Sequence, residues 1–269
     1  MKKSKYYFLL VAIGALLITM SSCNLISAAG LSSKGLPTKE VSGDLISTTA
    51  NSEVNVDHSE WNELLQKHVS EEGLLDYKGF MKDREKLDDY LSKLSEMKPT
   101  DKWSVQEQLA YYINIYNAYT VDLILKNYPV ESIKDLDGPW TKEIVSIGDV
   151  EISLGGVENS VLRKMNEPRI HFAINCASIS CPDLLNEAFT AAKINEQLDR
   201  ATMAFINSDK NEISKKSVKL SSIFDWYEKD FIEDGKTVLD YINKYSAAKV
   251  APGTSISYKD YNWNLNEQK

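Results

Sequence analysis

Residues 104–126 read SVQEQLAYYINIYNAYTVDLILK, and this stretch decides the fold. Ser104, with Glu107 three residues later, matches a capping box, in which the two side chains satisfy the first free N–H groups of a helix. The run that follows is largely apolar as far as Lys126. Pro129 then ends it, because a proline pushes the residue before it away from helical backbone. The stretch therefore predicts one long helix.

The segments on either side of this helix predict a mixture of short helices and strands. Helical spacing of apolar residues, capping signals and prolines at first helical positions indicate helices at 57–69, 78–94, 153–162, 182–205, 224–231 and 237–245. Alternating runs and the turn dipeptide Gly148-Asp149 indicate strands at 143–147, 150–152, 170–175, 218–220 and 256–258. The expected fold class is α+β, a helix-rich single domain packed around a small, mainly antiparallel sheet.

The first 23 residues resemble a bacterial lipoprotein export signal. Three lysines precede an apolar run from Phe8 to Met20, which is too short for a permanent membrane span. Small residues then precede Cys23, as in a lipobox, where the cysteine is lipidated and becomes the mature N-terminus. The alternative is an ordinary signal peptide in which Cys23 is incidental. Residues 24–55 are rich in small and hydroxyl side chains and predict a flexible tether, so the globular domain is expected at 56–269.

Composition narrows the class of function. The chain carries 31 basic and 39 acidic residues, a formal net charge of −8, and loss of the three lysines in the signal makes the balance −11. An acidic domain without a basic cluster is a poor partner for nucleic acid and for anionic lipid. The expected partners are therefore the membrane, through a lipid on Cys23, and a small molecule or peptide. The expected location is the cell envelope of a bacterium, on its periplasmic or surface face.

Known cofactor and catalytic motifs are not found in residues 24–269. This range holds no Gly-rich phosphate loop, no dinucleotide-binding fingerprint and no Gly-x-Ser-x-Gly elbow. We therefore expect no nucleotide cofactor and no serine hydrolase chemistry.

The segment 169–182, RIHFAINCASISCP, concentrates one of the three histidines and two of the three cysteines. On a strand, His171 and Asn175 would face the same side and line one wall of a site. Cys181 directly precedes Pro182, and a helix that starts there would favour the thiolate form of Cys181. The segment therefore marks a candidate site.

The cysteines of this segment have three interpretations. With Cys23 lipidated, Cys176 and Cys181 are an even number in an oxidising compartment, which favours a disulfide. The second interpretation is a thiol nucleophile with His171 as its base. An extended chain would put His171 about 16 Å from Cys176, so this pairing needs a bend or a return of Cys181. The third is a metal site, but His171 and two thiolates supply too few ligands, and no metal is expected.

Two asparagines interrupt the apolar surface of the long helix. Asn114 and Asn117 are three residues apart and share a face. Buried carboxamides need hydrogen-bond partners. These two therefore either tie the backbone of a neighbouring loop or line a pocket, where they would hold a substrate or an oxyanion.

Glu158 also has two interpretations. It either orients His171 or transfers protons itself, or it has no catalytic role and is a solvated helix carboxylate or the ion-pair partner of Arg163 or Arg169. The ion pair is favoured because it needs no special context. The aromatic residues of 224–231 predict core anchors rather than a ligand platform.

Several ordered motifs carry a resemblance to a known family. They are 108–118, Ser153-Leu154, Val157-Glu158, 169–182, Leu220-Ser221, Trp226-Tyr227, Asp230-Phe231 and 261–266. At these positions, from about Trp61 to Asn266, the chain resembles the domain of unknown function 547, whose bacterial members often carry export signals. The family implies no assigned activity. Tyr111-Tyr112 stand where its pattern usually has Phe-Trp. Asn159 stands where it often has His, so His171 would have to supply any proton transfer that this His performs.

Two hypotheses for the function follow. The first is an exported thiol-dependent hydrolase or acyl-transferase that acts on an amide or peptide bond. Its candidate catalytic residues are His171, Cys176, Cys181 and Glu158, and its candidate substrate-binding residues are Asn114, Asn117, Asn175 and Arg169. The alternative is a non-catalytic envelope module that binds a ligand or partner and contains a Cys176–Cys181 disulfide.

Overall fold

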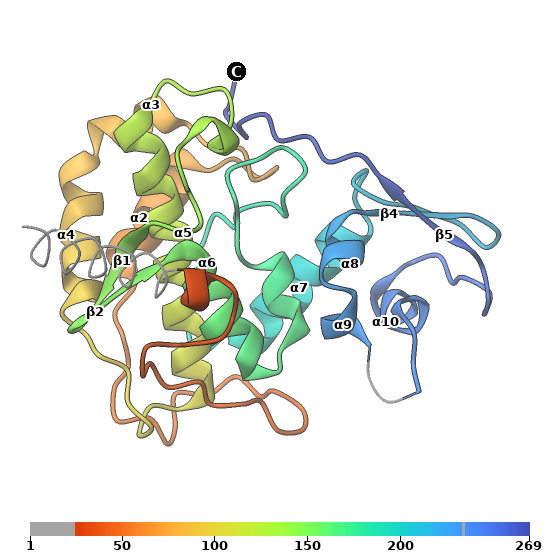
Figure 1. Ribbon diagram of the computed structural model, residues 1–269, viewed down its shortest axis with the longest axis horizontal. Helices are drawn as coiled ribbons and strands as arrows, with labels where there is room; N and C mark the ends of the chain where they lie inside the picture. The colour runs from red at the N-terminus through yellow and green to blue at the C-terminus, as the bar shows by residue number, and fades with distance from the viewer. Residues whose placement is uncertain (1–24, 233–234) are drawn as a thin grey trace, which may run out of the picture.

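The computed structural model describes residues 25–232 and 235–269 (Figure 1). The predicted export signal, with Cys23, lies outside these residues. In the part of the chain that the structure describes, no helix combines the length and the apolar character needed to cross a membrane.

The long helix predicted from the sequence is present and lies at the centre of the larger core. It is α5, Val105–Asn127, and its residues are buried on all sides over most of its length. Ser104 caps it, since its Oγ accepts a hydrogen bond from the N–H of Glu107 at 3.1 Å. The capping box is not closed, however, because the Glu107 carboxylate accepts instead from the N–H of Val56 at 2.8 Å. Burial raises the pKa of Glu107.

Three helices and a hairpin surround α5. The helices are α2 (Ser59–His68), α3 (Tyr77–Lys82) and α4 (Arg84–Ser95), and the antiparallel hairpin is β1 (Glu143–Ile147) with β2 (Val150–Ser153). Figure 1 shows these elements grouped on one side of the molecule. The predicted hairpin is confirmed, whereas the predicted helix at 78–94 is two helices that meet at Asp83.

A series of short helical turns connects the hairpin to the second half of the molecule. In order they are α6 (Leu154–Gly156), the π-helical turn η2 (Val157–Val161), and the 3-10 turns η3 (Leu162–Met165) and η4 (Pro168–Phe172). The predicted cap is confirmed, because Ser153 Oγ accepts from the N–H of Gly156 at 3.0 Å. A shorter 3-10 turn, η1 (Ile133–Asp135), follows α5.

The second half combines four helices with a small sheet. Its helices are α7 (Ile194–Ile206), α8 (Ile223–Trp226), α9 (Glu228–Phe231) and α10 (Val238–Tyr245), and its strands are β3 (Glu212–Ile213), β4 (Val218–Ser221) and β5 (Ile256–Lys259). Strand β4 pairs antiparallel with β3 and parallel with β5. Phe172 anchors this half, with ring centroids 5.1 Å from Phe205 and 5.6 Å from Phe231. The α+β prediction is confirmed.

The C-terminal segment returns across the molecule and joins the two halves. After β5 the chain runs back towards α3, as Figure 1 shows in dark blue. The N–H of Leu265 donates to the carbonyl of Glu131 at 2.8 Å, and the N–H of Leu75 donates to the carbonyl of Asn266 at 2.9 Å. These hydrogen bonds hold the aromatic residues of the C-terminal segment next to the half of the molecule that contains α5.

Residues 25–55 do not form the predicted free tether. They lie along the surface of the first half, and Leu36, Val41 and Leu45 are buried in its core. The N–H of Val41 donates to the carbonyl of Met165 at 2.8 Å. The prediction of a flexible tether is wrong for these residues because a few isolated apolar side chains, together with backbone pairing, are enough to fix the segment.

Two predictions around residue 182 are also wrong. Residues 170–175 are not a strand: the 3-10 turn η4 begins at Pro168, and the Glu167 side chain caps it by accepting from the N–H of Arg169 at 3.2 Å. No helix begins at Pro182, since α7 starts only at Ile194. Side chains of other elements bind the backbone of the intervening loop, so it needs no helical hydrogen bonds of its own.

Candidate functional site

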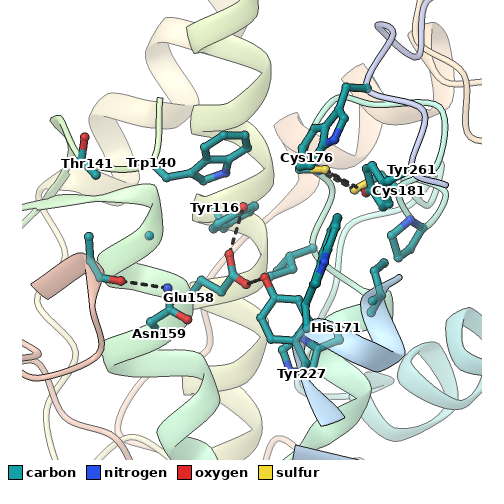
Figure 2. A pocket seen from close by; sticks show the side chains of 17 residues that line it. Tyr116, Trp140, Thr141, Glu158, Asn159, His171, Cys176, Cys181, Tyr227 and Tyr261 are labelled. Carbon is teal, nitrogen blue, oxygen red and sulfur yellow. Dashed lines mark hydrogen bonds between the residues drawn. The ribbon is translucent and has the colours of Figure 1, made fainter. Parts of the chain in front are cut away.

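A pocket of about 410 Å³ lies between the two halves, where several of the predicted site residues meet (Figure 2). The first half contributes Tyr116 of α5 and Glu158 of η2, and the second half contributes Trp226 and Tyr227. Cys176 completes one wall. A pocket of this size between packed units is typical of a small-molecule site.

The two cysteines form one corner of the pocket. Both are free thiols, with the Sγ atoms of Cys176 and Cys181 in hydrogen-bond contact at 2.7 Å. Cys176 Sγ is also 3.2 Å from Ser178 Oγ and 3.3 Å from the Tyr261 hydroxyl. Cys176 is half-buried, whereas Cys181 is buried. The structure therefore places the sulfur of the half-buried Cys176 among three groups that can donate to it.

These contacts separate the two thiols chemically. The hydrogen bond from Cys181 lowers the pKa of Cys176 against the opposing effect of burial, and the hydroxyls of Ser178 and Tyr261 lower it further. Burial raises the pKa of Cys181, as does its role as donor to Cys176. Because the thiolate is the nucleophilic form, Cys176 is the candidate nucleophile of the pair. The predicted helix N-terminus that would have favoured Cys181 is absent.

The loop that carries Cys176 has a strained backbone. Ala177 adopts φ +58°, in the left-handed region that side chains other than glycine rarely occupy. Its N–H donates to Asn175 Oδ1 at 2.8 Å, and Asn175 Nδ2 donates to the carbonyl of Pro182 at 2.7 Å. Asn175 thus closes the loop that brings the two sulfurs together, and its amide is used inside the fold.

His171 lines the same pocket but does not contact a thiol. Its Nε2 donates to Asp230 Oδ2 at 2.8 Å, and its ring stacks on Tyr227 with a centroid distance of 4.1 Å. Arg163 also binds Asp230, with Nη2 2.8 Å from Oδ1. Burial alone would raise the pKa of Asp230, but the hydrogen bonds from His171 and Arg163 hold it well below its usual range. In the described residues no hydrogen bond joins His171 to either cysteine, so the predicted Cys–His pair is not formed.

Glu158 lies between two tyrosine hydroxyl groups. Its carboxylate accepts from the hydroxyl of Tyr227 at 2.5 Å and from that of Tyr116 at 3.4 Å, as Figure 2 shows. Among the described residues it forms no hydrogen bond with His171 and no ion pair with an arginine, since both His171 and Arg163 bind Asp230. The π-helical turn carries Glu158, and such turns are frequent at functional sites. Glu158 is the acidic side chain of the pocket wall.

A wall of aromatic rings closes the side of the pocket near the C-terminal segment. Trp226 stacks on Trp263 with centroids 5.8 Å apart, and Tyr261 lies 4.5 Å from Trp263. Trp140 meets Trp263 edge to face at 5.8 Å. Trp226 is 47% exposed, which makes it unusual for a core anchor. The prediction that the aromatic residues of 224–231 are core anchors is therefore right for Phe224 and Phe231 and wrong for the exposed Trp226, while Tyr227 packs against the same core and also lines the pocket.

Asn159 occupies the pocket wall beside Glu158, at the position where a histidine is frequent in the resembling family. Its Nδ2 donates to the carbonyl of Ala28 at 2.9 Å, and its Oδ1 accepts from Arg163 at 3.0 Å. The Nδ2 end of the amide therefore holds the N-terminal segment against η2, whereas the Oδ1 end binds Arg163 of η3. Ala28 thereby becomes part of the pocket wall.

Two further predicted substrate-binding residues, Asn114 and Asn117, bind the backbone of loops near the pocket. Asn114 exchanges two hydrogen bonds with the backbone of Phe189, at 2.7 and 3.0 Å. Asn117 donates to the carbonyl of Ala173 at 2.9 Å and accepts from the N–H of Asn175 at 2.8 Å. These contacts support the interpretation of both asparagines as residues that tie a loop.

Arg169 is also used inside the fold. Its guanidinium is nearly buried and binds Glu167 at 2.6 Å and Asp199 at 2.7 Å. The described residues that line the pocket do not include Asn114, Asn117, Asn175 or Arg169. The sequence missed the residues that do line it, chiefly Tyr116, Trp140, Trp226, Tyr227, Tyr261 and Trp263.

Residues 100–206 match the model of a family described as "Protein of unknown function, DUF547". Over these residues the chain is similar to the DUF547 family, in agreement with the resemblance seen in its motifs. The DUF547 segment contains α5, Glu158, His171 and both cysteines, whereas the aromatic residues Trp226, Tyr261 and Trp263 lie beyond it. Neither a curated protein nor a solved structure matches the chain. A family description without an activity gives no function, so the function is inferred from the geometry of the site.

Proposed function

We propose that the protein is a thiol-dependent hydrolase or acyl-transferase that acts on an amide or peptide bond, with Cys176 as its nucleophile. The observation that carries the proposal is the position of Cys176 Sγ. It lies in the wall of a pocket that can hold a ligand, and neighbouring groups lower its pKa. Cys181 has the opposite properties and serves as a donor to the Cys176 thiolate.

The reaction has two steps, acylation and deacylation of Cys176, and each step forms one bond and breaks one bond. The Cys176 thiolate attacks the carbonyl carbon of the bound amide, the C–N bond breaks, and the leaving amine takes up the proton that Cys176 lost on ionising. Water then attacks the thioester, which releases a carboxylic acid and restores the thiol; in acyl transfer an amine takes the place of water. Thiolate formation here depends on the hydrogen bonds at 2.7–3.3 Å rather than on a histidine base.

The experiment uses an activated acyl donor, p-nitrophenyl acetate, with the reduced protein. The proposal predicts that intact mass and peptide mapping will find one acetyl group on Cys176 and that Cys176→Ser will abolish it. Cys181→Ser is the matched control, because it replaces the neighbouring sulfur but keeps a hydroxyl donor. Cys176 should still be acetylated in this variant. Acetyl groups spread over lysines, with none on Cys176, would refute the proposal.

A second candidate function is a non-catalytic binding module. The hydrogen bonds of Asn114, Asn117, Asn175 and Arg169 favour it, since all these polar groups are used inside the fold. It predicts that the pocket binds its ligand equally well when Cys176 is replaced by Ser and that no acylation of Cys176 is measurable.

We further propose that Cys23 carries a lipid that anchors the protein in the bacterial cell envelope. The lipobox-like residues before Cys23 support it. Ala28 lies in the pocket wall, and five residues of chain reach at most about 18 Å, so such an anchor would keep the pocket close to the membrane. Cys23→Ser should move the protein from the membrane fraction to the soluble fraction, and the mass of the N-terminal peptide should show the lipid. An unmodified Cys23 in wild-type protein would contradict this proposal.

A further inference from the structure

The lining of the pocket combines one acidic side chain with a wall of aromatic rings. Glu158 is 6% exposed and lies in a wall that also contains Trp140, Trp226, Trp263 and Tyr261. Within the described lining residues there is no lysine and no arginine. A cation is attracted both by a carboxylate and by the face of an aromatic ring.

The hydrogen-bonding groups of the lining are mostly used within the protein. Glu158 accepts from two tyrosines, both ends of the Asn159 amide are occupied, and the Tyr261 hydroxyl lies among Cys176 and Ser178. A ligand that binds mainly through hydrogen bonds would compete with these contacts. A quaternary ammonium group needs none, because it has no N–H to donate and binds through charge and the faces of rings.

From this lining we propose that the pocket binds an organic cation whose quaternary ammonium group lies against the aromatic wall, with Glu158 as the balancing charge. The inference deepens the proposed function, since it names the class of ligand for the same pocket, but binding of the cation does not depend on the Cys176 thiol. The pocket, at about 410 Å³, is large enough for an ammonium group together with a further acyl or alkyl portion.

A cation of the protein itself already lies on one of these rings. Lys134 Nζ is 5.2 Å from the centroid of the Trp263 ring, and Lys134 is exposed. Its charge repels a second cation and competes for the electron density of the same ring. Replacement by the apolar Met should therefore increase the affinity for a cationic ligand by a few fold, whereas it should leave the affinity for a neutral ligand unchanged.

The test compares choline with its neutral carbon isostere, in which a tert-butyl group replaces trimethylammonium. The two probes have nearly the same shape and differ in charge. Calorimetric titration of the full-length protein should give at least about tenfold tighter binding of choline. Equal affinity for the two probes, or no measurable binding of choline, overturns the proposal.

Matched variants locate the binding site. Trp226→Leu should weaken choline binding several fold while Trp226→Phe, which keeps an aromatic face, should retain it. Glu158→Gln should weaken it, whereas Glu228→Gln removes the same charge from an exposed position outside the pocket and should not. Equal effects within either pair overturn the proposal. Cys176→Ser should bind choline normally, so failure of this inference is distinguishable from failure of the thiol chemistry.

Discussion

Asn117→Ala tests whether a buried carboxamide holds the loop that leads to Cys176. Asn117 is 2% exposed and makes two hydrogen bonds to the backbone of this loop, one to the carbonyl of Ala173 and one from the N–H of Asn175. Truncation leaves both backbone groups buried without their partner. This is costlier than the simple loss of two hydrogen bonds, because each stranded group also loses its hydration.

The expected destabilisation follows from these two groups. An unsatisfied buried donor or acceptor costs about 1–3 kcal/mol, so two of them lower the free energy of unfolding by about 4 kcal/mol. With a urea dependence of about 3 kcal/mol per molar for a protein of this size, the midpoint of unfolding should fall by about 1.3 M.

The assay is urea unfolding followed by circular dichroism, with Asn127→Ala as the control. Asn127 lies on the same helix and is exposed, and its side chain donates to the carbonyl of Leu123, so its replacement should change stability by no more than about 0.5 kcal/mol. If the two variants have the same midpoint, Asn117 does not hold the loop and the reasoning fails.

Three further predictions concern a buried histidine, the thiol pair and the pocket wall. Burial lowers the pKa of His58 from 6.5 to about 4, so the unfolded chain binds a proton that the folded chain does not. Stability should therefore fall by about 2 kcal/mol between pH 7 and pH 5, and His58→Gln should remove that part of the pH dependence of urea unfolding. Cys181→Ala removes a donor to the Cys176 thiolate and should raise the pKa of Cys176, measured as a shift of the pH profile of iodoacetamide alkylation to higher pH, while Cys181→Ser shifts it less. A Cβ on Gly155 would lie 2.6 Å from the carbonyl oxygen of Trp140, so Gly155→Ala should cost about 1–3 kcal/mol in thermal or urea unfolding, and an unchanged midpoint would contradict this packing.

The elements predicted correctly are those whose signals are local. Helix α5 has its own cap and its own terminating proline, and the β1–β2 hairpin has its own turn dipeptide. The Ser104 cap forms as predicted, but the second half of the capping box does not, because Glu107 meets the N–H of Val56. That contact joins residues 51 positions apart and has no local signal.

The elements predicted incorrectly are those that distant side chains hold in place. Residues 170–175 read as a strand because polar and apolar residues alternate, but all of them are buried, and the N–H of Asn175 binds Asn117 of α5 rather than a neighbouring strand. Likewise Asn114 satisfies the backbone of Phe189 in the stretch that was expected to be helical. A sequence pattern cannot indicate a partner contributed by another element.

The candidate site was predicted in part. The segment with His171 and the two cysteines does reach a pocket, and Glu158 lies in the same wall. The partner of His171, Asp230, and the aromatic wall come from segments that follow the DUF547 match. The signal that pointed to them was the set of motifs shared with the resembling family, which included Trp226-Tyr227, Asp230-Phe231 and the residues from 261 to 266.

The most direct test of the central claim is the state of the two thiols in the full-length protein purified without a reducing agent. The protein is alkylated with iodoacetamide at pH 6, with and without prior reduction, and analysed by mass spectrometry. Because the pKa of Cys176 is lowered and that of Cys181 is raised, we predict that Cys176 is alkylated rapidly without reduction and that Cys181 is protected. An intramolecular Cys176–Cys181 disulfide that blocks alkylation until the protein is reduced would contradict the account of a thiol nucleophile and favour the binding module.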